Sequence, residues 1–267
     1  KLTQHHEIHK KQVLVPAGAG AVLLVAFGIS EARRSPASTL PWGVVGQRGR
    51  VAALLGVGLA QGGLLSALVF LTFQLQNYMG FGPIATGVAV LPLVVAVILG
   101  SMGLAARLAP RVGGRVLLTA GLAVLGCGTL AFVFLPVDAN YPVHILPAVV
   151  LIGLGLGITL TTSAQLAIGG VAGGRLGVIS AVRTAAQQLG GSVGVALSGS
   201  VALNASAAFL ASRPPGSPAD VAHAAFVHGV TRAAVAVTIL LFAGAAACFA
   251  LSGSPARSVA EVRSGVD

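Results

Sequence analysis

The acidic side chains that could carry a proton or activate a nucleophile are few in this sequence. Its 267 residues contain six, namely Glu7, Glu31, Asp138, Asp220, Glu261 and Asp267. All six stand outside the long apolar segments. Because proton relays through membranes commonly titrate an intramembrane Asp, Glu or His, we expect no proton carrier in this chain. We also expect no enzymatic activity and no cofactor.

The side chains that could bind a metal are equally sparse. Cys127 and Cys248 each lie within an apolar segment, which argues against a disulfide scaffold or a zinc site and favours packing. His5, His6 and His9 lie close together, but no Cys or carboxylate cluster completes a ligand set. We therefore predict a solvated polar tail at residues 1–12 and no metal site.

Uncharged polar side chains do occur within the apolar segments. They are Gln61, Thr72 and Gln74 in one segment, Thr159, Thr161, Thr162, Ser163 and Gln165 in a second, and Gln187, Gln188 and Asn204 in a third. An amide in hydrocarbon costs free energy unless it is hydrogen-bonded. Each of these side chains therefore requires a partner helix or a water-filled cavity.

The composition shows which solvent the chain must face. Hydrophobic residues make up 55% of the chain and charged residues 8%, and the mean hydropathy is +0.93. A soluble domain could not cover such a chain with a polar surface, so the lipid bilayer is the expected partner. Long continuous apolar segments favour helices over a barrel. The net charge of +10 comes from scattered Lys and Arg without a basic face, which excludes nucleic acid as a partner.

Seven segments are long and apolar enough to span a bilayer, which takes about 20 residues. They are 13–30, 51–76, 84–108, 116–135, 145–168, 176–210 and 229–251. The sequence therefore predicts an all-α membrane protein with seven transmembrane helices.

The basic residues between these segments predict an orientation, because cytoplasmic loops are enriched in Lys and Arg. One set of loops and the carboxyl-terminal tail carry Arg33, Arg34, Arg48, Arg50, Arg107, Arg111, Arg115, Arg175, Arg183, Arg257 and Arg263. The opposite loops carry only Arg213 and Arg232. We expect a multi-pass protein of the bacterial inner membrane with a cytoplasmic carboxyl terminus.

Glycines are abundant within the predicted spans. Two sets stand out, Gly153, Gly155 and Gly157 in one span, and Gly190, Gly191 and Gly194 in another. Neither set follows a strand, so neither predicts a dinucleotide-binding loop. Small residues let membrane helices approach closely, and we predict helix packing at both.

Five segments in order resemble the fourteen-helix drug:proton antiporters of the major facilitator superfamily. They are 27–36, 74–76, 80–92, 100–115 and 187–196. Segment 100–115 is similar to the superfamily's Gly-x-x-x-Asp-Arg-x-Gly-Arg cytoplasmic loop. It includes Gly100, Arg107, Arg111, Gly113 and Arg115, with a Pro at the position before Arg111 where that loop often has Asp.

The resemblance covers roughly residue 17 to the end and implies a domain organisation. A polar tail at 1–12 is followed by an extra linker helix at 13–30 and a cytoplasmic loop at 31–50. Residues 51–252 form the six-helix carboxyl-terminal lobe of a major facilitator fold, built as inverted three-helix repeats. A cytoplasmic tail at 253–267 follows. The amino-terminal lobe would then be a missing partner, and it would carry the carboxylates that couple export to the proton gradient.

The resemblance also suggests which polar residues face a substrate. In the family, the first helix of each three-helix unit lines the central cavity, which makes Gln61, Thr161 and Gln165 candidates, together with Gln187. The substrate would be a small apolar or cationic organic compound. A second interpretation stays open, in which these side chains only hydrogen-bond between helices.

Two other functions stay open beside an efflux transporter lobe. A seven-helix membrane receptor or sensor matches the number of spans. A truncated, inactive product is the other alternative.

Overall fold

The computed structural model of the protein describes residues 46–134, 140–171, 175–212 and 217–251. All regular elements in these ranges are helical, as expected where the bilayer offers no hydrogen-bond partner to the backbone. The expected tails at 1–12 and 253–267 and the expected linker helix at 13–30 lie outside these ranges.

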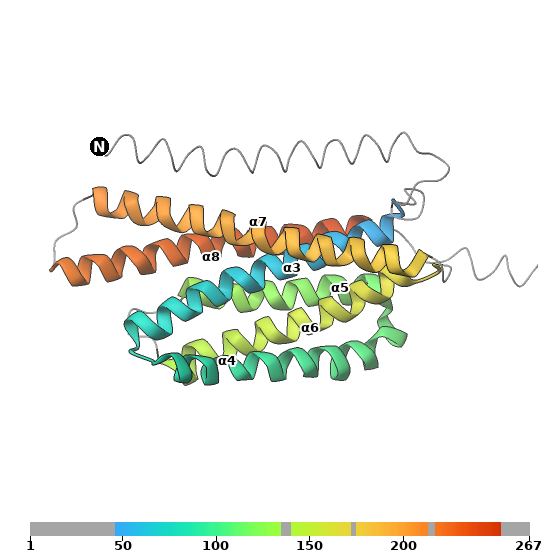
Figure 1. Cartoon of the computed structure of the whole chain (residues 1–267), viewed down its shortest axis with the longest axis horizontal. Helices are drawn as coiled ribbons and strands as arrows, with labels where there is room; N and C mark the ends of the chain where they lie inside the picture. The colour runs from blue at the N-terminus through green and yellow to red at the C-terminus, as the bar shows by residue number, and fades with distance from the viewer. Residues whose placement is uncertain (1–45, 135–139, 172–174, 213–216, 252–267) are drawn as a thin grey trace, which may run out of the picture. The chain divides into compact units, whose positions relative to one another are not determined.

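The described chain contains six α-helices (Figure 1). They are α3 (Arg48–Phe73), α4 (Pro83–Ile98), α5 (Ala106–Ala131), α6 (Leu146–Ile168), α7 (Leu176–Ala211) and α8 (Pro218–Leu251). Short segments with other helical hydrogen bonding adjoin them, namely the π-helices η1 (Gln74–Tyr78), η2 (Leu99–Ala105) and η4 (Tyr141–Ile145), and the 3-10 helix η3 (Phe132–Phe134).

Five helical segments in the described ranges are long and apolar enough to cross a membrane. One of them, Pro83–Phe134, has 52 residues and would measure about 78 Å if straight, far more than the roughly 30 Å hydrocarbon core. Gly113 interrupts it with φ 76° and ψ 152°, a conformation that only glycine adopts without strain. The chain reverses there, so this segment contributes two spans.

Packing against α6 shows the reversal independently. A Cβ atom added to Gly153 of α6 would meet Ala96 of α4, and one added to Gly157 of α6 would meet Ser101 of η2. The contact residues therefore increase in number along both segments, so α4 and α6 run parallel. Along α5, Gly121 faces Thr159 whereas Gly128 faces Ile152, so α5 and α6 run antiparallel.

Two predicted boundaries were wrong. Arg111 was expected in a cytoplasmic loop but lies in helix, beyond the end of the span expected at 84–108. Gly100 and Arg107 of the expected loop motif lie within that span and are helical, with Gly100 buried in η2 against the backbone of Leu154. The helix continues because Gly113 alone provides the turn.

The last helix begins at Pro218 rather than at residue 229. Ser217 precedes it, and the Asp220 amide donates to Ser217 Oγ at 3.3 Å. A Ser cap with Pro in the first helical position and Asp in the third is a helix-start signal. Asp220 therefore belongs to the first turn of α8 rather than to a loop.

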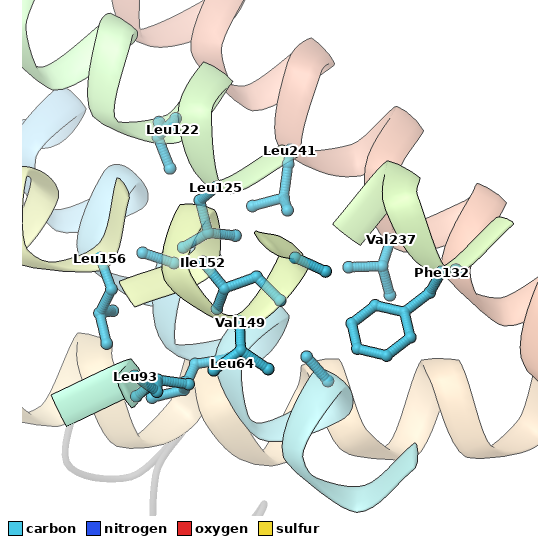
Figure 2. Packing of buried hydrophobic residues seen from close by; sticks show 14 of the residues in the cluster. Leu64, Leu93, Leu122, Leu125, Phe132, Val149, Ile152, Leu156, Val237 and Leu241 are labelled. Atoms are coloured by element: carbon cyan, nitrogen blue, oxygen red, sulfur yellow. The ribbon is translucent and has the colours of Figure 1, made fainter. Parts of the chain in front are cut away.

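The core lies where α5, α6 and α8 meet α3. Figure 2 shows Leu125, Ile152 and Leu241 from three of these helices pointing toward one another. All three are almost completely buried.

A second contact joins α3 to α7 through glycines on both helices. A Cβ on Gly194 would collide with the backbone of Gly62, and a Cβ on Gly62 would lie 2.7 Å from the carbonyl oxygen of Gly190. A Cβ on Gly190 would collide with the backbone of Gly58. The two backbones are therefore in direct contact over more than one helical turn.

The remaining two glycines of the predicted packing sets also face neighbours. A Cβ on Gly155 would lie 2.6 Å from the Gly121 carbonyl oxygen of α5, and one on Gly191 would lie 2.8 Å from Leu65 Cδ1 of α3.

A pair of α7 variants tests the contact between α3 and α7. We expect Gly194→Ala to lower the free energy of unfolding by about 1–3 kcal/mol, because the new methyl group forces the two backbones apart. The measurement is unfolding in lipid bicelles. Gly199→Ala is the control, because a Cβ there meets nothing within 4 Å, and it should be neutral or stabilising by up to about 1 kcal/mol. Equal effects of the two variants would contradict the close approach.

Candidate functional site

Two of the amides predicted to face a cavity form a pair across the contact between α3 and α7. Gln187 Nε2 donates a hydrogen bond to Gln61 Oε1 at 3.0 Å. Both side chains are partly exposed. Because the pair satisfies only one donor and one acceptor, the amides keep hydrogen-bonding capacity for a further group.

The other two predicted residues lie on α6. Thr161 Oγ1 is 2.6 Å from Ser101 Oγ of η2, which links α6 to the end of α4. Gln165 is exposed, one helical turn further along α6. No contact joins these two residues directly to the Gln61–Gln187 pair.

Arg183 connects the two sets of polar residues. Its Nη2 donates to the carbonyl oxygen of Leu160 at 2.9 Å and to Ser163 Oγ at 3.2 Å, and its Nε lies 3.3 Å from Ser163 Oγ. Arg183 also stands one helical turn before Gln187 on α7. The sequence placed Arg183 only among the basic residues of the expected cytoplasmic loops, because the partner atoms on α6 are distant in the chain.

Arg50 was expected in a loop, but it lies in the first turn of α3 and is buried. Its Nε donates to the carbonyl oxygen of Ala167 at 3.0 Å, and its Nη2 donates to that of Gly169 at 2.8 Å. These carbonyls end α6, where a helix lacks internal partners and attracts cations. The pair Gly169–Gly170 after an apolar segment marks such a helix end, but nothing in the sequence identifies which cation reaches it.

The remaining residues of the expected loop motif lie at the start of α5. Arg111 is exposed, and the guanidinium of Arg115 stacks on the Phe249 ring of α8, 3.8 Å from its centroid. A cation over an aromatic face is a favourable contact. Arg115 therefore joins the beginning of α5 to the end of α8.

The chemistry available to these side chains is recognition rather than reaction. Within the described ranges the one carboxylate is Asp220, in the first turn of α8. No group of three His, Cys, Asp or Glu residues there could hold a metal. Cys248 is buried, and its thiol donates to the carbonyl oxygen of Ala52 at 3.3 Å. The polar groups of this site can thus donate and accept hydrogen bonds.

Comparison with known proteins decides the family. A profile of the Major Facilitator Superfamily matches residues 10–195. The chain belongs to the major facilitator superfamily. It is a multi-pass membrane protein of a transporter family, as the ordered segments and the apolar helices predicted.

Three relatives within the superfamily are named for antibiotic resistance or export. The puromycin resistance protein Pur8 of Streptomyces alboniger is 42% identical over 225 residues, covering 83% of this chain and 44% of Pur8. A probable actinorhodin transporter of Streptomyces coelicolor is 31% identical over 194 residues, covering 71% of this chain and 33% of that protein. The cephamycin export protein CmcT of Amycolatopsis lactamdurans is 28% identical over 195 residues, or 73% of this chain and 40% of CmcT. This chain spans less than half of the length of these relatives.

A double-mutant cycle tests the amide pair of this major facilitator protein. We expect Gln61→Leu and Gln187→Leu each to lower the free energy of unfolding, because each leaves one amide without its partner. The double variant should lose less free energy of unfolding than the two single variants lose together, with a coupling free energy of about 0.6–1.7 kcal/mol. Gln188→Leu, at an exposed neighbour, is the control and should change stability by less than about 0.5 kcal/mol. Strict additivity in the cycle would show that the amides do not interact.

Proposed function

We propose that this chain forms one lobe of a proton-coupled exporter of small organic molecules, apolar or cationic. The observation that carries the proposal is the partly exposed Gln61–Gln187 pair, held between α3 and α7. Such amides orient a ligand without demanding a particular charge. Thr161 and Gln165 extend the proposed cavity along α6. The names of the relatives support export of antibiotics.

The pairing of the helices supports an inverted repeat of α3–α4–α5 and α6–α7–α8. If the two units are related by a pseudo-twofold axis, α3 should pack on α7 in the way that α6 packs on α4. Both contacts use glycines four residues apart on the first helix of a unit. Gly58 and Gly62 face α7, and Gly153 and Gly157 face α4 and η2.

We infer the orientation from the arginines at one end of the bundle. Arg50 reaches the end of α6, and Arg115 reaches the end of α8, so both lie with the beginnings of α3 and α5. Basic residues mark the cytoplasmic side. The end of α8, and with it the carboxyl-terminal side of the lobe, would face the cytoplasm of a bacterium.

We assign proton coupling to the other lobe. Asp220 belongs to the end of the bundle opposite these arginines, because Ser206 near the end of α7 donates to the Ala225 carbonyl near the start of α8 at 2.9 Å. A carboxylate at a helix terminus is poorly placed to carry protons through the bilayer. The coupling carboxylates of the proposed antiporter would therefore lie outside the described helices.

A seven-helix receptor would account for the spans equally well, but the named relatives are resistance and export proteins. An inactive truncated product predicts the same fold. Only transport measurements separate it from a working lobe.

The first experiment asks whether the chain needs a second lobe. The chain is expressed alone and with the unmatched part of Pur8 joined before Lys1, in cells sensitive to puromycin. We expect resistance and pH-driven efflux of a fluorescent cation only from the joined protein, because the chain alone lacks the coupling carboxylates.

Pur8 itself serves as the positive control, and membrane levels are matched by immunoblot. Robust pH-driven efflux by the chain alone would overturn the assignment of coupling to the other lobe. A joined protein that reaches the membrane at the level of Pur8 and transports nothing would overturn the proposed function.

The second experiment tests a cavity residue. In the joined protein we expect Gln165→Leu to reduce efflux about two- to tenfold, because one hydrogen bond to substrate is lost, without a change in thermal stability. Gln188→Leu on α7 is the matched control. Equal efflux by the two variants would remove Gln165 from the cavity.

A further inference from the structure

A groove that Gln61 and Gln187 do not line lies between α3, α7 and α8. The cavity has a volume of about 660 Å³. The helices α7 and α8 are in contact near the start of α8, because a Cβ on Gly229 would lie 2.6 Å from the carbonyl oxygen of Ala202. Further along, the groove separates them, and Leu189 and Val193 of α7 face Leu240 of α8 across it. Glycines of α3 form part of its floor.

The wall of the groove offers nothing to a polar ligand. Ser198 is the one polar residue among the described residues that line it, and its hydroxyl donates to Ser66 Oγ at 2.9 Å. Gln61 and Gln187 do not line it. Leu189 and Val193 keep more than half of their surface exposed, so the groove lacks a cover of matching apolar groups.

A cation stands at one end of this apolar surface. Arg48 precedes Val51 by three residues and Leu55 by seven on α3, and this spacing places all three on one helix face. Val51 and Leu55 line the groove. Arg48 is exposed, and no hydrogen bond or ion pair joins it to another residue in the part of the chain that the structure describes. It belongs to the same end of the bundle as Arg50 and Arg115.

The length of the groove fits a lipid chain. Its floor runs from Val51 to Gly63 of α3, about 18 Å at 1.5 Å per residue. One leaflet is about 15 Å deep, half of the hydrocarbon core. An acyl chain in the groove would therefore have its headgroup at the level of the membrane surface, where Arg48 begins α3.

We propose that this groove binds one anionic glycerophospholipid, with an acyl chain against the glycines of α3 and the phosphate at Arg48. An apolar helix from a protein partner would fill the groove but would offer no anion to the guanidinium. A water-soluble anion would pair with Arg48 but would leave the apolar wall uncovered. A phospholipid satisfies both, because basic residues at the cytoplasmic surface attract anionic headgroups and the groove desolvates the chain.

Native mass spectrometry of the full chain in detergent tests the proposal. The protein is titrated with phosphatidylglycerol or with phosphatidylcholine that has the same acyl chains. We expect the wild-type protein to retain one phosphatidylglycerol molecule about fivefold more strongly than phosphatidylcholine, the effect of one basic residue near an anionic surface. Arg48→Gln should abolish the preference. Arg107→Gln, which removes an exposed arginine of α5 outside the groove, should keep it.

Two further variants locate the acyl chain. Ala236→Phe on α8 and Val193→Trp on α7 each fill part of the groove and should lower retention of both lipids. Melting temperatures confirm that the variants fold. Equal loss of preference in Arg48→Gln and Arg107→Gln would overturn the headgroup site, and unchanged retention in both groove-filled folded variants would overturn the acyl site. A wild-type protein that retains neither lipid would overturn the proposal.

Discussion

Direct contact between the backbones of α3 and α7 determines how the polar groups of this bundle are arranged. In a bilayer, apolar helices gain little from hiding apolar surface from lipid, so their association depends on close packing and on hydrogen bonds between helices. The glycine pairs supply the close packing. On either side of them, Gln187 donates to Gln61 at 3.0 Å and Ser198 donates to Ser66 at 2.9 Å. The short serine side chains can meet across the contact only because the glycines bring the helices together.

The arginines extend this arrangement to α6. Arg50 ties the start of α3 to the end of α6, and Arg183 ties α7 to the last turns of α6. Ser101 and Thr161 add a link from η2 to the same helix. The helices proposed to line the cavity are thus joined at one end by hydrogen bonds that a sliding motion between them would break. That arrangement supports movement of the proposed lobe as one body, the way in which transporter repeats rock against each other.

The two sides of the contact between α3 and α7 differ in chemistry. One presents the paired amides and Arg183, which can exchange hydrogen bonds with a substrate. The other presents the apolar groove, where hydrocarbon is the matching partner and Arg48 provides one charge at the rim. The same two helices form both surfaces. A molecule bound in the groove would therefore affect the spacing of α3 and α7, and with it the hydrogen bond of the amide pair.

Composition and hydropathy were enough to predict the solvent, the helical class and most of the helices. Apolar segments of about 20 residues have no other way to satisfy their backbones in lipid, and the span expected at 176–210 is observed as α7, Leu176–Ala211. The ordered segments also indicated the family that the profile shows. Hydropathy predicted the last span from residue 229, whereas α8 begins at Pro218. Its start is marked by the Ser217 cap rather than by apolar residues.

Which polar groups meet depends on how the helices pack in three dimensions. Gln61 and Gln187 are separated by 126 residues, and Arg50 and Gly169 by 119; local patterns carry no information about such distances. The groove depends on how far α7 and α8 diverge above α3, and this is set by close helix packing at Gly194, which lines the groove, and at Gly229. Periodicity and hydropathy describe one helix at a time, whereas a site in a membrane bundle arises from the angle and register between helices.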